Sequence, residues 1–538
     1  MSNNRTNRFL PLWLAVSTIL GILIGTFYGN QQAGNKLMNV IQGGSNKLSS
    51  LLYYLSDKYV DDVNVSSLVE KSIPHILSEL DPHSTYVSAS AAATADDDLR
   101  GSFSGVGIEF IIRQDTIRVQ RVIPGGPAER AGLLAGDKIV TANNKVLTGD
   151  TITNQTAIST LKGPEGSKVT LGIMRHHEKT VKYFTVTREE IRMKSITATH
   201  MLDDNTGYIK LRNFGENTYP EMLVALARLS QAGFENLVVD LRGNTGGYVA
   251  TAQQIVNEFL PSNRMIVYME GKHYSREELK SNGHGSYQRI PLVVLIDEGS
   301  ASASEIFAGA IQDNDRGTIV GRRSFGKGLV QEAIGFTDGS MMRLTIARYY
   351  TPSGRCIQKP YDEYEEDLTV RYERGELFTS DSIKHTGPAY HTRNGRTVYG
   401  GGGITPDVFV GQDTLGVTSY YKEAIISGLL MEFCFDYADR HEEELKKYDD
   451  EDDLVKYLKG LNLVEQFAQY GQEHSLPRRN LMIQKSHQLL EEFILARMVY
   501  NLLDEEALVK YQNRSDPAIK EALRLFKTKS AFPQNRER

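Results

Sequence analysis

Three short stretches of the sequence carry residue types that could do chemistry. The first is DLRGNTGG at residues 240–247, which follows an apolar run. Its adjacent glycines allow backbone conformations in which successive N–H groups point at one spot, as in sites that bind an anion. The other interpretation is a tight turn between a strand and a helix, without a ligand. The stretch taken alone leaves both open.

The second stretch is GSASASE at residues 299–305, between an apolar run and a helical pattern. Ser302 and Glu305 fit the S-x-x-E capping box, which satisfies backbone donors at a helix start. The functional alternative is a serine nucleophile at a helix N-terminus, where nearby N–H groups can stabilise an oxyanion. The residues alone do not separate Ser302 from Ser300 and Ser304 as the nucleophile.

The third stretch is GRRSFGKG at residues 321–328. It nearly matches the phosphate-binding P-loop, but Gly328 stands where the serine or threonine that binds magnesium is needed. Residues 329–334 read as a strand and not as the helix that a P-loop requires. The pattern therefore argues against a nucleotide-hydrolysing enzyme.

The elements that must position these stretches alternate along residues 205–410. Apolar runs at 237–240 and 292–296 predict buried strands, and amphipathic patterns at 248–259 and 305–311 predict helices. Strands that alternate with helices in this way indicate an α/β core.

The flanking regions have a different texture. Residues 35–95 predict helices that a turn at 81–84 interrupts, and residues 101–190 predict short strands with two short helices near 128–131 and 156–161. After Asp413 the pattern is helical to the end, with an acidic run at 449–453 that we interpret as a solvated turn.

The N-terminus carries an uncharged apolar run at residues 9–28, preceded by Arg5 and Arg8. Twenty helical residues rise about 30 Å, which is enough to cross a bilayer. The run therefore predicts a membrane anchor with its N-terminus in the cytoplasm and the rest of the chain exported. A cleaved signal peptide is the alternative, although Thr26-Phe27-Tyr28 is a poor cleavage site.

Composition excludes several classes of protein. The 538 residues hold 61 Lys plus Arg against 67 Asp plus Glu, a net charge of -6, which gives no support to a nucleic-acid binder. Two cysteines, Cys356 and Cys434, exclude a disulfide-rich scaffold and a four-cysteine zinc site, and no HExxH motif is present. We therefore expect no metal site.

Together the motifs resemble one family, the C-terminal processing peptidases or tail-specific proteases, which are PDZ-containing serine endopeptidases. The shared motifs are LDPHS at 80–84, FSGVGI at 103–108, GPA at 126–128, AGL at 131–133, GD at 136–137, DLR at 240–242 with GG at 246–247, residues 300–305, FGKG at 325–328 with Gln331, TPSGR at 351–355, and GGITPD at 402–407. The resemblance covers roughly residues 45–410 and leaves the role of the helical tail open.

The resemblance implies a Ser/Lys dyad with Ser302 as nucleophile and Lys327 as general base, oriented by Gln331. A lysine acts as a base only when it is neutral, which requires burial and neighbours that lower its pKa. For the oxyanion hole the resemblance implies the amide of Ala303 and that of a glycine, either Gly246 or Gly247. It implies no cofactor.

For residues 101–190 the resemblance implies a PDZ domain, in which Gly105, Val106, Gly107 and Ile108 would hold the carboxylate of a peptide tail. An ordinary glycine-rich strand entry is the alternative for this segment. The predicted function is cleavage of exported proteins recognised by their C-terminal tails, in the periplasm or elsewhere in the cell envelope. A catalytically silent PDZ adaptor is the second hypothesis, and a homo-oligomer is left open.

The expected architecture is a multidomain α/β protein with a core similar to crotonase and Clp protease and an inserted PDZ domain. The boundaries we predict are 1–30 for the anchor or signal, 31–100 for an N-terminal helical region, 101–190 for the PDZ domain, 191–412 for the peptidase core, and 413–538 for a helical extension.

Overall fold

The computed structural model describes residues 45–92, 97–113, 115–149, 152–175, 180–362, 364–384 and 387–531. The apolar run at 9–28 lies outside these residues, and with it the choice between an anchor and a signal peptide. In the part of the chain that is described, no helix is both long and apolar enough to cross a membrane. The chain forms two compact units, which divide between Asp81 and Pro82.

The first unit contains two helices, α2 (Ser45–Lys58) and α3 (Val65–Ser78). The side chain of Asn64 accepts the Ser67 N–H at 3.0 Å and so caps the start of α3. The predicted helical character of this part of the chain is confirmed.

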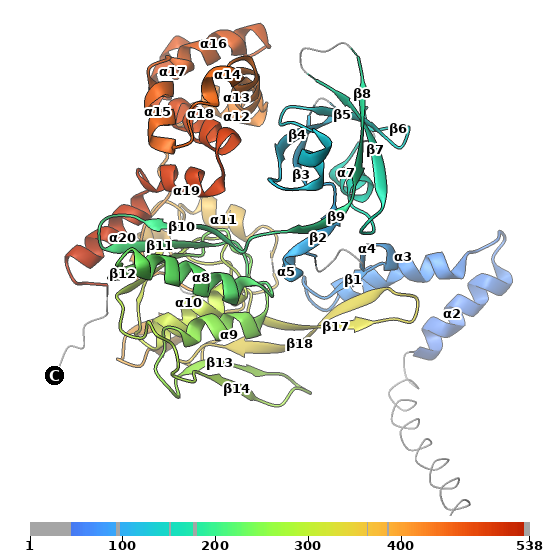
Figure 1. The fold of residues 1–538 in the computed structure, drawn as a ribbon. Helices are drawn as coiled ribbons and strands as arrows, with labels where there is room; N and C mark the ends of the chain where they lie inside the picture. The colour runs from blue at the N-terminus through green and yellow to red at the C-terminus, as the bar shows by residue number, and fades with distance from the viewer. Residues whose placement is uncertain are drawn as a thin grey trace, which may run out of the picture. The chain divides into compact units, whose positions relative to one another are not determined.

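A six-stranded sheet forms the centre of the second unit. In the order β10-β11-β12-β15-β16-β21, only β10 is antiparallel to its neighbour. The strands are β10 (Ile196–Met201), β11 (Thr206–Leu211), β12 (Asn236–Asp240), β15 (Leu292–Ile296), β16 (Thr318–Gly321) and β21 (Val408–Phe409), with helices α8 (Thr218–Gln231), α9 (Val249–Asn257) and α10 (Ala303–Asp313) between them. The predicted α/β alternation is confirmed (Figure 1).

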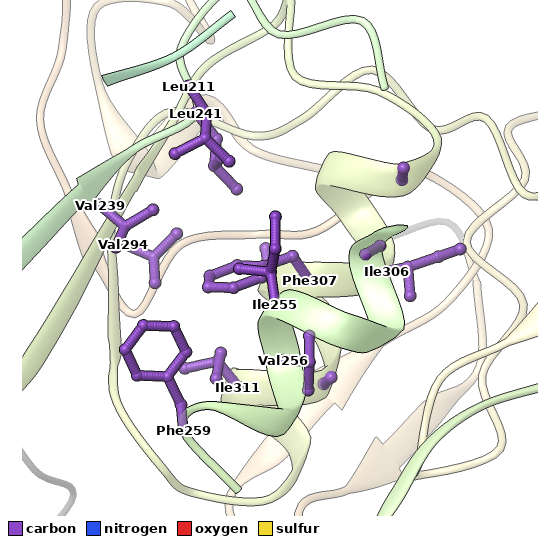
Figure 2. Packing of buried hydrophobic residues seen from close by; sticks show 14 of the residues in the cluster. Leu211, Val239, Leu241, Ile255, Val256, Phe259, Val294, Ile306, Phe307 and Ile311 are labelled. Carbon is purple, nitrogen blue, oxygen red and sulfur yellow. The ribbon is translucent and has the colours of Figure 1, made fainter. Parts of the chain in front are cut away.

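Both faces of this sheet are covered, which explains its nearly continuous apolar strands. On one face Val239 and Val294 pack against Ile255 of α9, against Phe259 just after that helix, and against Phe307 of α10 (Figure 2). On the other face the alternate strand residues, Val238, Val293 and Leu295 among them, pack against α20 (Pro517–Lys527). The last described helix therefore completes the core of the α/β region.

A second sheet has the order β1-β18-β13-β14, with β17 also paired to β18. Its strands are β1 (Thr85–Val87), β13 (Met265–Glu270), β14 (Glu277–Lys280), β17 (Leu329–Gly335) and β18 (Met341–Tyr350). The strand expected after the FGKG motif is confirmed as β17. The helical interpretation of residues 35–95 is wrong at 85–87, because these β-favouring residues pair with Met341–Arg343.

Residues 102–192 build a separate small sheet with its own apolar core. Its strands run in the order β3-β4-β5-β7-β8, and a two-stranded ribbon of β2 and β9 flanks it. The elements are β2 (Ser102–Gly105), β3 (Ile108–Arg113), β4 (Thr116–Val122), α6 (Pro127–Ala131), β5 (Lys138–Ala142), β6 (Lys145–Val146), α7 (Asn154–Leu161), β7 (Lys168–Met174), β8 (Lys182–Thr187) and β9 (Glu189–Arg192). The two short helices expected here are confirmed.

Helices dominate the C-terminal region, as predicted. They are α12 (Ser419–Ile426), α13 (Leu429–Arg440), α14 (Glu442–Leu445), α15 (Glu451–Lys459), α16 (Leu463–Glu473), α17 (Asn480–Lys485), α18 (His487–Leu502) and α19 (Glu505–Asn513), followed by α20. In the acidic run at 449–453, four of the five side chains are exposed, as predicted, but the run starts helix α15 and is not a simple turn. Asp450 caps α15, and Glu451 is buried beside Lys510 and Arg514. The remaining elements are α4 (Ala89–Ala92), α5 (Asp97–Arg100), α11 (Asp367–Glu373), η2 (Ser380–Ser382), β19 (Ala389–His391) and β20 (Thr397–Tyr399).

The C-terminal helices contact the small sheet through charged side chains. Arg118 lies on β4 between the core residues Ile117 and Val119, so it points away from that core, yet it is only 7% exposed. It lies 3.8 Å from a carboxylate oxygen of Glu432 and 3.9 Å from one of Asp436, both on α13. The helical region thus covers the outer face of β4. The predicted domain boundaries themselves stay predictions.

Candidate active site

Ser302 occupies a strained turn between β15 and α10. Its φ of 55° and ψ of -114° match the first central position of a type II′ turn, which normally requires glycine. Such a conformation costs about 1–3 kcal/mol and persists only where the surroundings enforce it. Ser302 is partly exposed and borders a cavity of about 830 Å³.

The two neighbouring serines have structural partners. Ser300 and Ser304 are fully buried, and their hydroxyls donate to the carbonyls of Leu241 and Asn244 at 2.8 Å. Neither borders the cavity. Of the three serines, Ser302 is therefore the one that borders the cavity.

The capping interaction expected of Glu305 is present but is only part of its bonding. Its Oε2 accepts the Ser302 N–H at 2.9 Å and also the Lys327 N–H at 2.8 Å. Its Oε1 accepts the Ser324 hydroxyl at 2.5 Å and the Gly326 N–H at 2.8 Å. Burial raises the pKa of Glu305 to about 7, against the opposing effect of these four hydrogen bonds.

The glycine turn at 240–247 lies against Ser302. A Cβ at Gly246 would be 2.7 Å from the Ser302 Cβ, so only glycine fits there. The Gly246 N–H donates to Asn244 Oδ1 at 2.9 Å, and its carbonyl accepts the Phe214 N–H at 2.9 Å. Among the described residues, no carbonyl or side chain accepts a hydrogen bond from the N–H of Gly247 or of Ala303. The two free amides are thus those of Gly247 and Ala303.

Asp240 anchors the start of this turn. It is 1% exposed and accepts hydrogen bonds from the Tyr208 hydroxyl at 2.7 Å and from Arg242 Nη2 at 2.7 Å, and it lies 3.2 Å from Lys210 Nζ. The neighbouring cations hold the pKa of this carboxyl below its usual range despite its burial. These contacts fix the residue from which the turn begins.

Lys327 lies in the loop before β17 and borders the same cavity as Ser302. Its Nζ donates to Gln331 Oε1 at 3.2 Å. The Gln331 Nε2 donates to the backbone carbonyl of His83 at 2.6 Å, which turns the amide oxygen toward the lysine. The LDPHS motif thus contributes a main-chain acceptor behind the lysine.

Tyr349 contacts the backbones of both Ser302 and Lys327. Its hydroxyl lies 3.0 Å from the Ser302 carbonyl and is also within hydrogen-bond distance of the Lys327 carbonyl. The side chain is 1% exposed, and burial raises the pKa of its hydroxyl well above the usual value, so the group stays a proton donor.

The cavity brings together five of the six residues predicted for this site: Ser302, Lys327, Gln331, Gly246 and Gly247. The sixth, Ala303, is fully buried at the first position of α10. Apolar side chains of β17 also line the cavity, together with charged groups; the additional lining residues include Tyr248, Leu329, Val330, Ala333, Arg212, Glu332 and Arg343. The cavity wall therefore offers both apolar and charged contacts.

The predicted carboxylate loop lies elsewhere, between β2 and β3. Gly105, Val106, Gly107 and Ile108 are all buried, and Gly107 has a φ of 79°. β3 is the terminal strand in the order of its sheet, so one of its edges has no strand partner within the described residues. An unpaired edge is the feature that a PDZ domain offers to a peptide.

Sequence reasoning missed the roles of four contributors to the site. Tyr349 gives no sequence signal, since a tyrosine in an alternating strand is ordinary. Glu305 was recognised only as a helix cap, and the carbonyl of His83 carries no side-chain signature at all. Asn244, whose Oδ1 accepts the hydrogen bond from the Gly246 N–H, lay within the 240–247 motif without an assigned role.

Three family models match the chain. Peptidase family S41 matches residues 205–370, a PDZ domain matches residues 118–175, and a family of unknown function matches residues 420–504. The first two coincide with the α/β region and the small sheet, and the third with the C-terminal helices. The predicted PDZ fold and peptidase core are therefore confirmed.

Among known proteins, the carboxy-terminal-processing protease of Bartonella bacilliformis is 35% identical over 333 residues, which is 60% of this chain and 76% of the relative. The carboxy-terminal processing protease CtpB of Bacillus subtilis is 33% identical over 316 residues, 58% of this chain and 65% of the relative. Among solved structures, the photosystem II D1 C-terminal processing protease is 26% identical with a TM-score of 0.36, over 68% of this chain and 92% of that one. Because this TM-score is low, the assignment rests on the sequence relatives. The chain belongs to the carboxy-terminal processing proteases of peptidase family S41, which are serine peptidases.

Proposed function

We propose that the chain cleaves peptide bonds with a Ser/Lys dyad formed by Ser302 and Lys327. The observation that carries this is the shared cavity, which both side chains border and in which Gln331 binds the lysine amine. The strained backbone of Ser302 supports it, because such strain is typical of nucleophile turns.

The proposed reaction follows from these positions. The neutral amine of Lys327 takes the proton of the Ser302 hydroxyl, and Oγ attacks the carbonyl carbon of the substrate. The N–H groups of Ala303 and Gly247 stabilise the negative oxygen; the Gly246 N–H is already bound by Asn244. The Lys327 ammonium then protonates the leaving amine, and water hydrolyses the ester formed on Ser302. No metal or organic cofactor takes part.

We further propose that the small sheet selects substrates by their C-terminal tails. A tail would add beside the free edge of β3, and the N–H groups of Gly105–Ile108 would hold its carboxylate. The PDZ family match supports this use of the loop.

Tail recognition is tested with an unfolded model protein that ends in a free acid and the same protein amidated at its C-terminus. The amide removes the charge that the loop would bind, and a hydrogen bond to a charged group contributes about 1.5–3 kcal/mol. We expect kcat/KM to fall about tenfold or more, mainly through KM.

The matched control for this experiment is the same substrate acetylated at its N-terminus. Acetylation removes the positive charge of the N-terminal amine and leaves the C-terminal carboxylate intact, so this substrate should be cleaved as before. Equal cleavage of the free-acid and amidated substrates would count against the carboxylate loop while leaving the dyad untouched.

We propose that the catalytic part works outside the cytoplasm, held to the membrane by residues 9–28. The arginines at positions 5 and 8 favour this orientation. Full-length protein in membranes should then resist extraction by high salt and be released by detergent, and protease added from the outside should digest it. A mature chain that begins near Gly29 and is released without detergent would instead establish a cleaved signal.

A further inference from the structure

We propose that Glu305 is a positioning residue that fixes the nucleophile and the base of the peptidase relative to each other. The inference rests on the proposed roles of Ser302 and Lys327 and extends them to a group that does not touch the substrate.

The geometry around one oxygen atom carries the inference. Glu305 Oε2 lies between two backbone amides and accepts the N–H of Ser302 at 2.9 Å and that of Lys327 at 2.8 Å. The two donors lie in different elements, one at the start of α10 and the other in the loop before β17. A single atom therefore sets the separation of the two main chains that carry the dyad.

The second carboxylate oxygen holds the lysine loop from behind. Oε1 accepts the Gly326 N–H at 2.8 Å and the Ser324 hydroxyl at 2.5 Å. Three of the four bonds to Glu305 thus reach the loop at 324–327, and only one serves the helix start. A capping role accounts for the bond to Ser302 and leaves the other three unexplained.

Tyr349 reinforces the same arrangement from the carbonyl side. Its hydroxyl contacts the carbonyls of both Ser302 and Lys327, and since it has one proton it donates to one of them at a time. The main chains of the two residues are consequently tied by their N–H groups to Glu305 and by their C=O groups to Tyr349. Both side chains are at most 1% exposed, so water does not compete for these bonds.

The chemistry of the partners makes a carboxylate necessary. Three of the four donors are backbone N–H groups, which cannot accept a hydrogen bond. A glutamine has one acceptor oxygen and one NH2 group, so in either orientation its NH2 faces at least one backbone N–H. Glu305→Gln keeps the size of the side chain but cannot keep all four bonds.

The test compares kcat and KM of full-length Glu305→Gln with those of the wild type, using a tail-bearing substrate. A small misplacement of reacting groups costs about a hundredfold in rate, so we expect kcat to fall roughly ten- to a hundredfold. KM should stay within about twofold, because the cavity walls and the predicted carboxylate loop are unchanged. Rates are normalised to folded protein, measured by circular dichroism.

The matched control is Glu258→Gln. Glu258 is also buried in the α/β region, at 7% exposure, and its carboxylate accepts the Tyr219 hydroxyl at 2.8 Å and the Ser286 N–H at 3.3 Å. It does not contact Ser302 or Lys327, so its loss should lower stability without lowering kcat per folded molecule.

A second variant keeps the inference testable if Glu305→Gln does not fold. Tyr349→Phe retains the buried ring and removes only the hydroxyl, and we expect a smaller fall in kcat with KM unchanged. Wild-type kcat in folded Glu305→Gln would overturn the proposal, as would wild-type kcat in Tyr349→Phe when Glu305→Gln is unfolded. Full activity of Ser302→Ala or Lys327→Arg would instead refute the dyad, whatever Glu305 does.

Discussion

Ser302→Ala is expected to abolish peptide hydrolysis, with kcat reduced by about 10⁴-fold or more, because no other group at this position can form the ester intermediate. The substitution removes one oxygen atom from a side chain that borders the cavity and leaves the bonds of the Ser302 main chain to Glu305 and Tyr349 in place. The variant should therefore fold normally and still bind a tail peptide. Isothermal titration calorimetry measures the affinity of this binding.

Ser304→Ala is the matched control for this loss. Its hydroxyl donates to the Asn244 carbonyl in the buried interior, so the substitution should lower the free energy of unfolding by about 1 kcal/mol. We expect kcat to remain near that of the wild type. Hydrolysis by purified Ser302→Ala at more than a few per cent of the wild-type rate would assign the nucleophile to another residue.

Lys327→Arg is expected to inactivate the enzyme although it keeps the positive charge. A guanidinium stays protonated at any useful pH, so it cannot take the proton from Ser302. Loss of a general base lowers kcat by about 10²–10⁴-fold. Wild-type kcat should rise with increasing pH, since the base acts in its neutral form and the neutral fraction grows as protons are lost.

Glu305 contributes to the same pH profile with the same sign. Its pKa is raised to about 7, so its carboxylate form, which alone accepts all four hydrogen bonds, is progressively lost as the pH falls through neutrality.

The control for the Lys327→Arg substitution is Lys280→Arg, at a side chain that is 46% exposed and pairs with Glu278 on the surface. Near-normal hydrolysis by folded Lys327→Arg would remove the dyad from the mechanism.

Local rules account for what could be predicted well. The helix expected at 305–311 is part of α10, and the strand expected at 329–334 is β17, because apolar spacing reflects the period of each structure. The short strand β1 was missed, since Thr85–Val87 becomes a strand only by pairing with β18, more than 250 residues away. The burial of Glu451 within the acidic run was missed for a similar reason. Its partners Lys510 and Arg514 lie in α19 and directly after it.

The sequence by itself determined the fold class, the family and the short segments in which the chemistry lies, because these follow from residue type, periodicity and the order of motifs. Only the tertiary structure decided which atoms of those segments are available. It left Ser302 at the cavity while burying Ser300 and Ser304, and it left the Gly247 N–H free while Asn244 bound that of Gly246. It also joined Ser302 to Lys327 through Glu305 and Tyr349. Such choices depend on hydrogen bonds between residues distant in the chain, and these exist only once the strands and helices have packed.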